Sequence, residues 1–425
     1  MEENNEKIIE QPTVQNSNNS EINSTNIINI NNINFETTPI VDIVNYILVT
    51  ATKSNASDIH FDPARDYLKV RLRIDGVLKT YLTVPNNVKQ NLTARVKILA
   101  GMNITETRLP QDGAIKTTID GLKLDMRVST LPAKKGEKIV IRIMDYSMSN
   151  QGIESLCFST QNYQKVIKMT NVPNGIILVT GATGSGKSTT VYSILQRLNT
   201  EETNIITVED PVEMEIEGIN QIQVNSDIGL DFATVLRSIL RQDPNIIMIG
   251  EIRDSETARI AVRASITGHL VLSTIHTNNS LSTIERLLDM DVERYLLASA
   301  LEGIISQKLA RKLCDHCKKP RATTEFEKTL FKKVLGIDVP QVYQAVGCQH
   351  CIDGYKGRIA IQEVLSINQE VRDAISSNIR KEELRKLVYN KDTTTLTQDG
   401  LYKVLAGFTT TDEILKLIEL DDDIY

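Results

Sequence analysis

A glycine-rich segment at residues 181–188 constrains the fold of this 425-residue chain more than any other feature. Its sequence, GATGSGKS, fits the pattern G-x-x-x-x-G-K-[ST]. An apolar run at 176–180 precedes it directly, and apolar residues follow it at the helical spacing Val191, Ile194, Leu195 and Leu198. Strand, glycine-rich loop and helix in this order are the arrangement in which backbone N–H groups bind phosphate. The sequence therefore predicts a nucleotide site rather than a chance match in a loop.

The residues of this segment have different expected roles. The glycines leave room for the backbone to turn its N–H groups toward phosphate oxygens. Lys187 is expected to reach the β and γ phosphates, and the Ser188 hydroxyl is expected to hold Mg²⁺. The predicted nucleotide-binding residues are Gly181, Thr183, Gly184, Ser185, Gly186, Lys187, Ser188 and Thr189.

Composition places the chain among soluble globular proteins, with 41% hydrophobic and 24% charged residues and room for two or three domains. No apolar stretch approaches the roughly 18 residues of a membrane span, and the N-terminus lacks the pattern of a signal peptide. We therefore expect a cytoplasmic protein. A net charge of −6 without a basic block gives no general electrostatic reason for nucleic-acid binding.

Three regions follow one another along the chain. Residues 1–36 are predicted to form a flexible tail, because the first 34 residues contain eleven Asn and little that could form a core. Residues 37–150 are predicted to form a small α+β domain, with helices at 41–51 and 91–100 and strands at 68–74, 124–128 and 139–143. Residues 151–425 are predicted to form an α/β domain with a mostly parallel sheet between helices, followed by a cysteine segment at 310–360 and a helical end.

Three further apolar runs, at 205–208, 246–249 and 270–273, each end in polar groups. They are followed by Glu209, Glu251 and His276, respectively, and the carboxyl ends of parallel strands share one ligand crevice. Glu251 is expected to hold the water shell of Mg²⁺ or to orient the attacking water, and Glu209 is the alternative base. His276 could sense a γ-phosphate. Taken singly, the carboxylates could be solvated strand ends, and His276 and His269 could be core imidazoles.

Phosphoryl transfer also needs positive charge on the developing anion. The candidates are Arg108, Arg127, Arg142 and Arg253, and the residue pattern alone does not choose among them. An arginine supplied by a neighbouring subunit would make hydrolysis depend on assembly.

Four of the five cysteines form two C-x-x-C pairs, Cys314 with Cys317 and Cys348 with Cys351, separated by thirty residues. Two such pairs supply the four thiolates of a closed, structural Zn²⁺ site. Redox-active pairs or ordinary thiols are the alternatives, and His316 or His350 could replace a cysteine as a ligand. Cys157 stands alone and is predicted to be a small buried hydrophobe.

Several segments resemble the motifs of one family. Residues 181–190, 207–213, 241–254 and 267–278 resemble, in order, the Walker A motif, Asp box, Walker B motif and His box of the secretion ATPases, the GspE/PilB family. The resemblance extends to residues 57–60, 109–113, 127–130 and 351–358, and it covers roughly residues 45 to 420.

This resemblance implies a hexameric cytoplasmic ATPase in which a smaller, PAS-like N-terminal domain closes over ATP and Mg²⁺ in a RecA-like domain. It implies type IV pilus assembly through a polytopic inner-membrane platform protein, at the inner face of the cell membrane. By position it favours Arg127 over Arg142, and the cysteine segment favours extension over retraction. A type II secretion or DNA-uptake pseudopilus motor is the alternative, and a nucleic-acid translocase or a non-catalytic adaptor is less favoured.

The sequence departs from the family pattern in three places. Ala182 replaces a common proline, and Ala114 stands where an arginine is common, so that Lys116 would have to supply that contact. The polar tail stands where many members have further N-terminal domains, which leaves open how the chain reaches its membrane partner.

Overall fold

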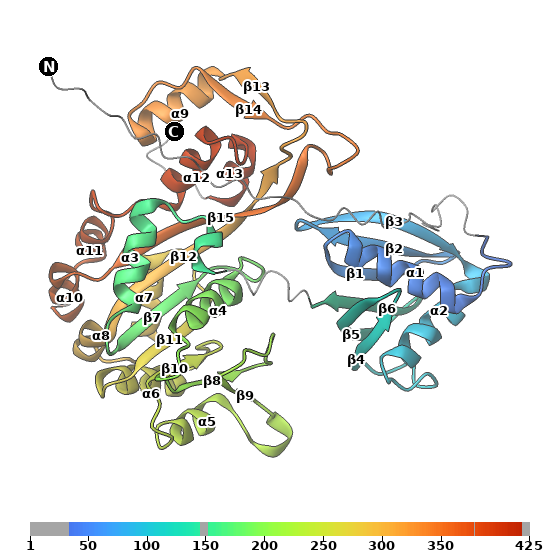
Figure 1. The fold of residues 1–425 in the computed structure, drawn as a ribbon, viewed down its shortest axis with the longest axis horizontal. Coiled ribbons are helices and arrows are strands. Elements are labelled where there is room, and N and C mark those ends of the chain that lie inside the picture. The colour runs from blue at the N-terminus through green and yellow to red at the C-terminus, as the bar shows by residue number, and fades with distance from the viewer. Residues whose placement is uncertain (1–33, 145–151, 378, 419–425) are drawn as a thin grey trace, which may run out of the picture.

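The structure is a computed structural model that describes residues 34–144, 152–377 and 379–418. These residues form an N-terminal domain built on one sheet, a larger domain built on a second sheet, and a C-terminal module that carries the cysteines (Figure 1). The predicted tail at 1–36 lies outside the described residues except for its last three positions. Within the described residues, none of the helices combines the length and the apolar character that crossing a membrane requires.

The N-terminal domain contains a six-stranded antiparallel sheet in the order β3-β2-β1-β6-β5-β4. One face of this sheet packs against two helices around a buried aliphatic core. Its elements are α1 (Ile40–Lys53), β1 (Ala56–Pro63), β2 (Tyr67–Ile74), β3 (Val77–Pro85), α2 (Asn86–Leu99), β4 (Gln111–Ile119), β5 (Leu122–Ala133) and β6 (Gly136–Ile143).

The predicted helices and strands of this domain are confirmed, with one boundary corrected. The helix expected at 91–100 begins five residues earlier, directly after Pro85. Strands β1, β3 and β4 were not among the predicted elements.

The larger domain contains a seven-stranded sheet in the order β15-β12-β7-β11-β10-β8-β9, which is parallel except for β15. Helices α3 and α4 cover one face, and α5, α6, α7, α8, α10 and α11 cover the other (Figure 1). The predicted α/β class is confirmed. The strands are β7 (Gly175–Thr180), β8 (Ile205–Glu209), β9 (Asn220–Gln223), β10 (Ile246–Ile249), β11 (Leu270–Ile275), β12 (Leu301–Leu313) and β15 (Tyr355–Ser366). The helices are α3 (Thr160–Thr170), α4 (Lys187–Leu198), α5 (Phe232–Ile239), α6 (Ser255–Ile266), α7 (Ser280–Asp289), α8 (Arg294–Ala300), α10 (Gln369–Ser376) and α11 (Lys381–Val388).

The C-terminal module lies at the far end of strands β12 and β15, which pair antiparallel along most of their length (Figure 1). Its own small core joins a two-stranded sheet to three helices. These elements are β13 (Lys319–Ala322), α9 (Glu325–Leu335), β14 (Gln341–Gln344), α12 (Leu396–Leu405) and α13 (Thr411–Leu417).

The prediction that Cys157 is a buried hydrophobe is wrong. Cys157 is exposed, because it ends the short 3-10 helix Ile153–Leu156 in a left-handed conformation with φ of +54°. At that turn its thiol donates to the Ser155 carbonyl instead of entering a core.

Candidate active site and metal centre

The glycine-rich loop joins the fully buried strand β7 to helix α4. Gly181, Gly184 and Gly186 all have positive φ, and a Cβ on Gly181 would collide with the Gln307 carbonyl oxygen of β12. The loop therefore requires glycine for both its backbone conformation and its packing. Thr183, Gly184 and Ser188 are exposed, whereas Ser185 is buried and its hydroxyl has no hydrogen-bond partner among the described residues.

Lys187 is the first residue of α4 and is 9% exposed. Its ammonium group donates to the carbonyl oxygens of Gly181 at 2.8 Å and Ala182 at 3.2 Å, so it lies across the loop. Burial lowers the pKa of Lys187, and the negative charge of Glu251 opposes that shift. The two residues that were predicted to converge on one phosphate thus lie close enough to interact electrostatically.

Glu251 follows β10, and His276 follows β11, the strand between β10 and β7. The His276 Nε2 atom lies 3.4 Å from a Glu251 carboxylate oxygen, and Arg253 donates to the other carboxylate oxygen. His269 precedes β11 instead, and its backbone carbonyl accepts from the first residue of β7. It therefore lies at the opposite edge of the sheet from the loop.

Glu209 occupies a different environment from Glu251, although both stand at the carboxyl ends of parallel strands. It is 2% exposed, and its carboxylate accepts hydrogen bonds from Thr207 at 2.6 Å, from Gln221 at 3.1 Å and from the Tyr192 hydroxyl. Burial raises the pKa of Tyr192, and the charge of Glu209 raises it further. Tyr192 and Gln221 were not identified from the sequence; no local motif marks them.

The candidate arginines lie in four different settings. Arg253 is tied to Glu251 and lies 3.4 Å from Asp210. Arg127 of β5 donates to the Val212 carbonyl at 3.2 Å, in the loop that follows β8. Arg142 pairs with Asp58 at 3.2 Å, and the highly exposed Arg108 pairs with Glu106 at 2.8 Å.

Arg127 and Arg142 both lie near the rim of the site. Burial raises the pKa of Glu213, and the positive charges of Arg127 and Arg142 oppose that rise. The face of the N-terminal sheet that carries these arginines therefore approaches the loop after β8. Lys116 lies within 3.5 Å of Asp125 and is largely exposed.

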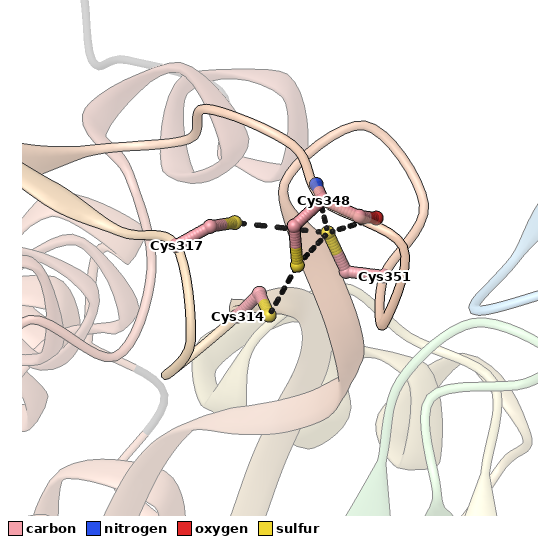
Figure 2. Close-up of side chains that lie close together, drawn as sticks. All are labelled: Cys314, Cys317, Cys348 and Cys351. Atoms are coloured by element: carbon pink, nitrogen blue, oxygen red, sulfur yellow. Dashed lines mark hydrogen bonds between the residues drawn. The ribbon is translucent and has the colours of Figure 1, made fainter.

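The four cysteines of the two C-x-x-C pairs converge from separate segments (Figure 2). Sulfur atoms lie 3.9 Å apart for Cys314 and Cys348, and 3.7 Å apart for Cys317 and Cys351 and for Cys348 and Cys351. Four sulfurs around an ion with metal–sulfur bonds of about 2.3 Å would be about 3.8 Å apart, whereas a disulfide bond is about 2.05 Å long. The cluster therefore fits a tetrahedral metal ion.

Backbone N–H groups support the thiolates of this cluster. The Gly347 N–H donates to Cys317 at 3.4 Å, and the Cys348 N–H donates to Cys351 at 3.2 Å. Burial raises the pKa of Cys351, but hydrogen bonds from the Cys348 N–H and from neighbouring thiols lower it to about 7 overall. The His316 and His350 rings lie 4.8 Å apart, and neither belongs to the cluster of ligand atoms that lie within 4.8 Å of one another.

A parallel sheet with a glycine-rich loop at the N-terminus of a helix, and with a carboxylate at a nearby strand end, defines a P-loop nucleotide hydrolase. A sequence model of the family described as "Type II/IV secretion system protein" matches residues 34–416. The chain belongs to this family, and it is an ATPase.

Curated relatives and solved structures agree with this assignment. The chain is 45% identical over 380 residues to "Type II secretion system protein E" of Pectobacterium carotovorum, covering 89% of this chain and 76% of that one. It is 45% identical over 374 residues to "Type IV pilus assembly ATPase PilB" of Thermus thermophilus, covering 88% of this chain but 42% of that one. The structure of "the Pilus Retraction Motor PilT and Bound ADP" matches with a TM-score of 0.60 at 26% identity, covering 90% of this chain and 98% of that one. The Legionella pneumophila ATPase DotB shares the fold, with a TM-score of 0.66 at 22% identity, covering 90% of this chain and 96% of that one.

Proposed function

We propose that the chain hydrolyses ATP as a subunit of a hexameric ring and thereby drives assembly of a type IV pilus through a polytopic membrane platform protein. The observation that carries the catalytic part is the convergence of Lys187, Glu251 and His276 at the carboxyl ends of neighbouring strands. The relatives support the biological part, since proteins of type IV pilus assembly and type II secretion share 45% identity with the chain.

The loop residues fit a triphosphate. The buried Ser185 hydroxyl lacks a partner among the described residues, and a phosphate oxygen would satisfy it. Lys187 would exchange its two carbonyl partners for β and γ phosphate oxygens, and N–H groups of residues 181–189 would hold the remaining oxygens. Ser188 is exposed in the first turn of α4 and would hold Mg²⁺, which neutralises charge on the phosphates.

Glu251 is the proposed residue that orients the attacking water, because its carboxylate contacts half-exposed partners near Lys187 rather than a buried hydrogen-bond network. His276 contacts Glu251 and could transmit the presence of a γ-phosphate to it. Glu209 remains a catalytic candidate, and its three protein donors favour a role in fixing the loop after β8.

Arg127 is the proposed source of the additional positive charge. In this conformation it lies at the loop after β8 rather than at the glycine-rich loop. We propose that closure of the N-terminal domain, in the same or a neighbouring subunit, brings it to the phosphates. If a neighbouring subunit supplies this arginine, ATP hydrolysis would depend on the assembled ring.

Zn²⁺ is the proposed occupant of the cysteine cluster, because four thiolates in tetrahedral spacing are its preferred closed ligand set. Its expected contribution is structural. We further propose a cytoplasmic protein at the inner face of the membrane, with the platform protein as its partner and no role for nucleic acid.

A motor of type II secretion or DNA uptake is the second candidate. The type II secretion relative is matched over 76% of its length, against 42% for the pilus-assembly relative from Thermus. In cells that carry Lys187→Ala, loss of surface fibres would favour the pilus, and loss of protein export with fibres intact would favour secretion. Strong stimulation of the purified ATPase by DNA would instead favour a translocase.

The catalytic roles can be separated with two substitutions. Lys187→Ala is expected to lose both nucleotide binding and turnover, whereas Glu251→Gln is expected to bind ATP and to lower kcat about 100-fold or more. Steady-state hydrolysis and binding of a fluorescent ATP analogue measure the two effects. Glu256→Gln is the matched control, since Glu256 pairs with Arg237 on the surface of α6 and should keep full turnover. Full turnover in Glu251→Gln would remove Glu251 from the mechanism.

A further inference from the structure

Gln307 of β12 contacts the glycine-rich loop, although it belongs to none of the sequence motifs described above. In the parallel pairing of β12 with β7, Ser306 lies opposite Thr180, which places Gln307 beside Gly181. Gln307 is 2% exposed, and its backbone oxygen fills the space that a Cβ on Gly181 would need. One residue of a neighbouring strand therefore forms a wall of the loop.

Both ends of the Gln307 amide hold this loop and the helix that follows it. Its Nε2 donates to the Ser185 carbonyl at 2.7 Å, and its Oε1 accepts from the Thr190 hydroxyl at 2.7 Å. The Ser185 carbonyl can only accept a hydrogen bond, so its partner must be a donor. The Gln307 amide supplies this donor at one end and an acceptor for the Thr190 hydroxyl at the other. Both hydrogen bonds are buried, which makes the loss of either one costly.

The contact with Ser185 fixes the direction of one N–H group in the loop. The Ser185–Gly186 peptide is trans, and in a planar trans peptide the N–H points opposite to the C=O. Because Gln307 holds the Ser185 carbonyl toward β12, the Gly186 N–H points away from β12. The N–H groups of this loop are the groups that bind phosphate in the proposed function.

We propose that Gln307 is a positioning residue for ATP hydrolysis, which orients the loop peptides before nucleotide binds. It acts through Ser185 and Thr190 and does not itself touch the phosphates. This inference rests on the proposed function, since it assigns Gln307 to the same nucleotide site. A loop that is oriented in advance avoids the cost of ordering at each turnover.

Gln362 offers a matched control. It lies directly opposite Gln307 on β15 and is 0% exposed, but its side chain donates to the Leu156 carbonyl at 3.2 Å, which is not part of the glycine-rich loop. Methionine has nearly the volume and flexibility of glutamine but lacks its strong donor and acceptor groups. Gln307→Met therefore removes two buried hydrogen bonds to the loop and its helix, whereas Gln362→Met removes one partly buried hydrogen bond from the adjacent strand and none to the loop.

The test measures ATP kcat and KM, the affinity for fluorescent ADP, and the rise in melting temperature on adding ADP with Mg²⁺. Gln307→Met is expected to lower kcat/KM by about 10- to 100-fold and to lose most of the thermal shift. Gln362→Met is expected to keep KM, ADP affinity and the full shift. Equal KM and ADP affinity in the two variants would overturn the proposal.

Two further variants, Thr190→Val and Lys187→Ala, cover the cases in which Gln307→Met does not fold or in which the proposed function itself is wrong. If Gln307→Met does not fold, Thr190→Val decides, because it removes the hydroxyl that anchors the Gln307 Oε1 while keeping its volume; unchanged ADP affinity in that variant would refute the proposal. Lys187→Ala separates this inference from the function on which it rests. Loss of binding in Lys187→Ala with none in Gln307→Met contradicts only the role of Gln307, whereas full turnover in Lys187→Ala contradicts the proposed function.

Discussion

At the scale of single residues, Glu209 and Glu251 both stand at the ends of parallel strands, but their carboxylates differ in burial and in hydrogen-bond partners. Glu209 accepts from three protein donors and is almost fully buried. Glu251 is held by Arg253 and His276, both of which are about half exposed. A residue that must contact water and change partners during turnover needs the second environment, because a fully satisfied buried network resists change.

Tyr192→Phe tests whether Glu209 is an anchor. The substitution removes a donor to the carboxylate and an acceptor for the Glu213 N–H at 3.1 Å, so it should lower the free energy of unfolding by about 1–3 kcal/mol. Tyr163→Phe is the control, since the Tyr163 hydroxyl pairs with Glu154 at an exposed position and its loss should cost below about 1 kcal/mol. Denaturant unfolding of both variants measures the difference. Equal losses would show that the Glu209 network is not a stabilising anchor.

Residues of the site could be predicted when their signal was local. The glycines, Lys187 and Ser188 form one contiguous pattern with strand and helix around it, and the strand ends led to Glu251 and His276. Gln307, Tyr192 and Gln221 reach the site from other elements, and they lie 122, 17 and 12 residues from their partners, so no local motif indicates them. Cys157 was misjudged because its exposure depends on a left-handed turn rather than on its residue type.

At the scale of elements, the antiparallel pair of β12 and β15 connects the nucleotide loop to the cysteine module. Gln307 directly follows the part of β12 that pairs with β7, and Cys314 directly follows the end of β12. Buried ion pairs hold the helices of the module, with Arg311 of β12 bonded to Glu413 at 2.7 Å. Burial would raise the pKa of Glu413, but hydrogen bonds from Arg311 and Lys416 hold it at about 2. The cysteine cluster therefore lies at the base of a packed module.

Cys314→Ser and Cys348→Ser test the metal site, because the first removes a ligand from one C-x-x-C pair and the second removes a ligand from the other. We expect one Zn²⁺ per chain in the unmodified protein by elemental analysis and substoichiometric metal in the variants. Their free energy of unfolding should fall by about 2–5 kcal/mol. Cys157→Ser is the control and should keep both metal and stability, since Cys157 is exposed and outside the cluster. Metal-free unmodified protein of full stability would refute the site.

Elements differed in how readily the sequence revealed them. Strands β7, β8, β10 and β11 are buried on both faces and appear as continuous apolar runs, so the parallel sheet could be predicted. Strand β4 carries mostly polar residues on its exposed face and few apolar residues on the other. Apolar and polar residues therefore alternate only weakly along it, and the sequence did not predict this strand. The start of α2 was missed because its first turn is polar.

At the scale of the whole molecule, polar contacts join the N-terminal domain to the rest. Besides Arg127 with Val212, Asp75 accepts from the Gly357 N–H at 2.8 Å, and Lys79 pairs with Asp353 at 2.6 Å. Lys79 and Asp353 form an exposed ion pair, and such a pair contributes about 0–1 kcal/mol to stability. Closure of the N-terminal domain over a nucleotide, as proposed above, would have to break these contacts.

The site of one subunit is incomplete in this conformation. Among the described residues, Arg253 is bound to Glu251, and Arg127 is bound to the loop after β8. In the proposed mechanism, hydrolysis depends on moving Arg127 to the phosphates, and a ring would supply both the movement and a neighbouring domain that can make it.

The most direct test is the rate of ATP hydrolysis per subunit as a function of oligomer size, measured on fractions whose mass is determined by light scattering. We expect activity in the hexamer, an inactive monomer, and a hexamer of Arg127→Ala that binds ATP but turns over about 10³-fold more slowly. Lys187→Ala defines the background rate. A monomer that hydrolyses ATP as fast per subunit as the hexamer would contradict the proposed dependence of hydrolysis on the ring.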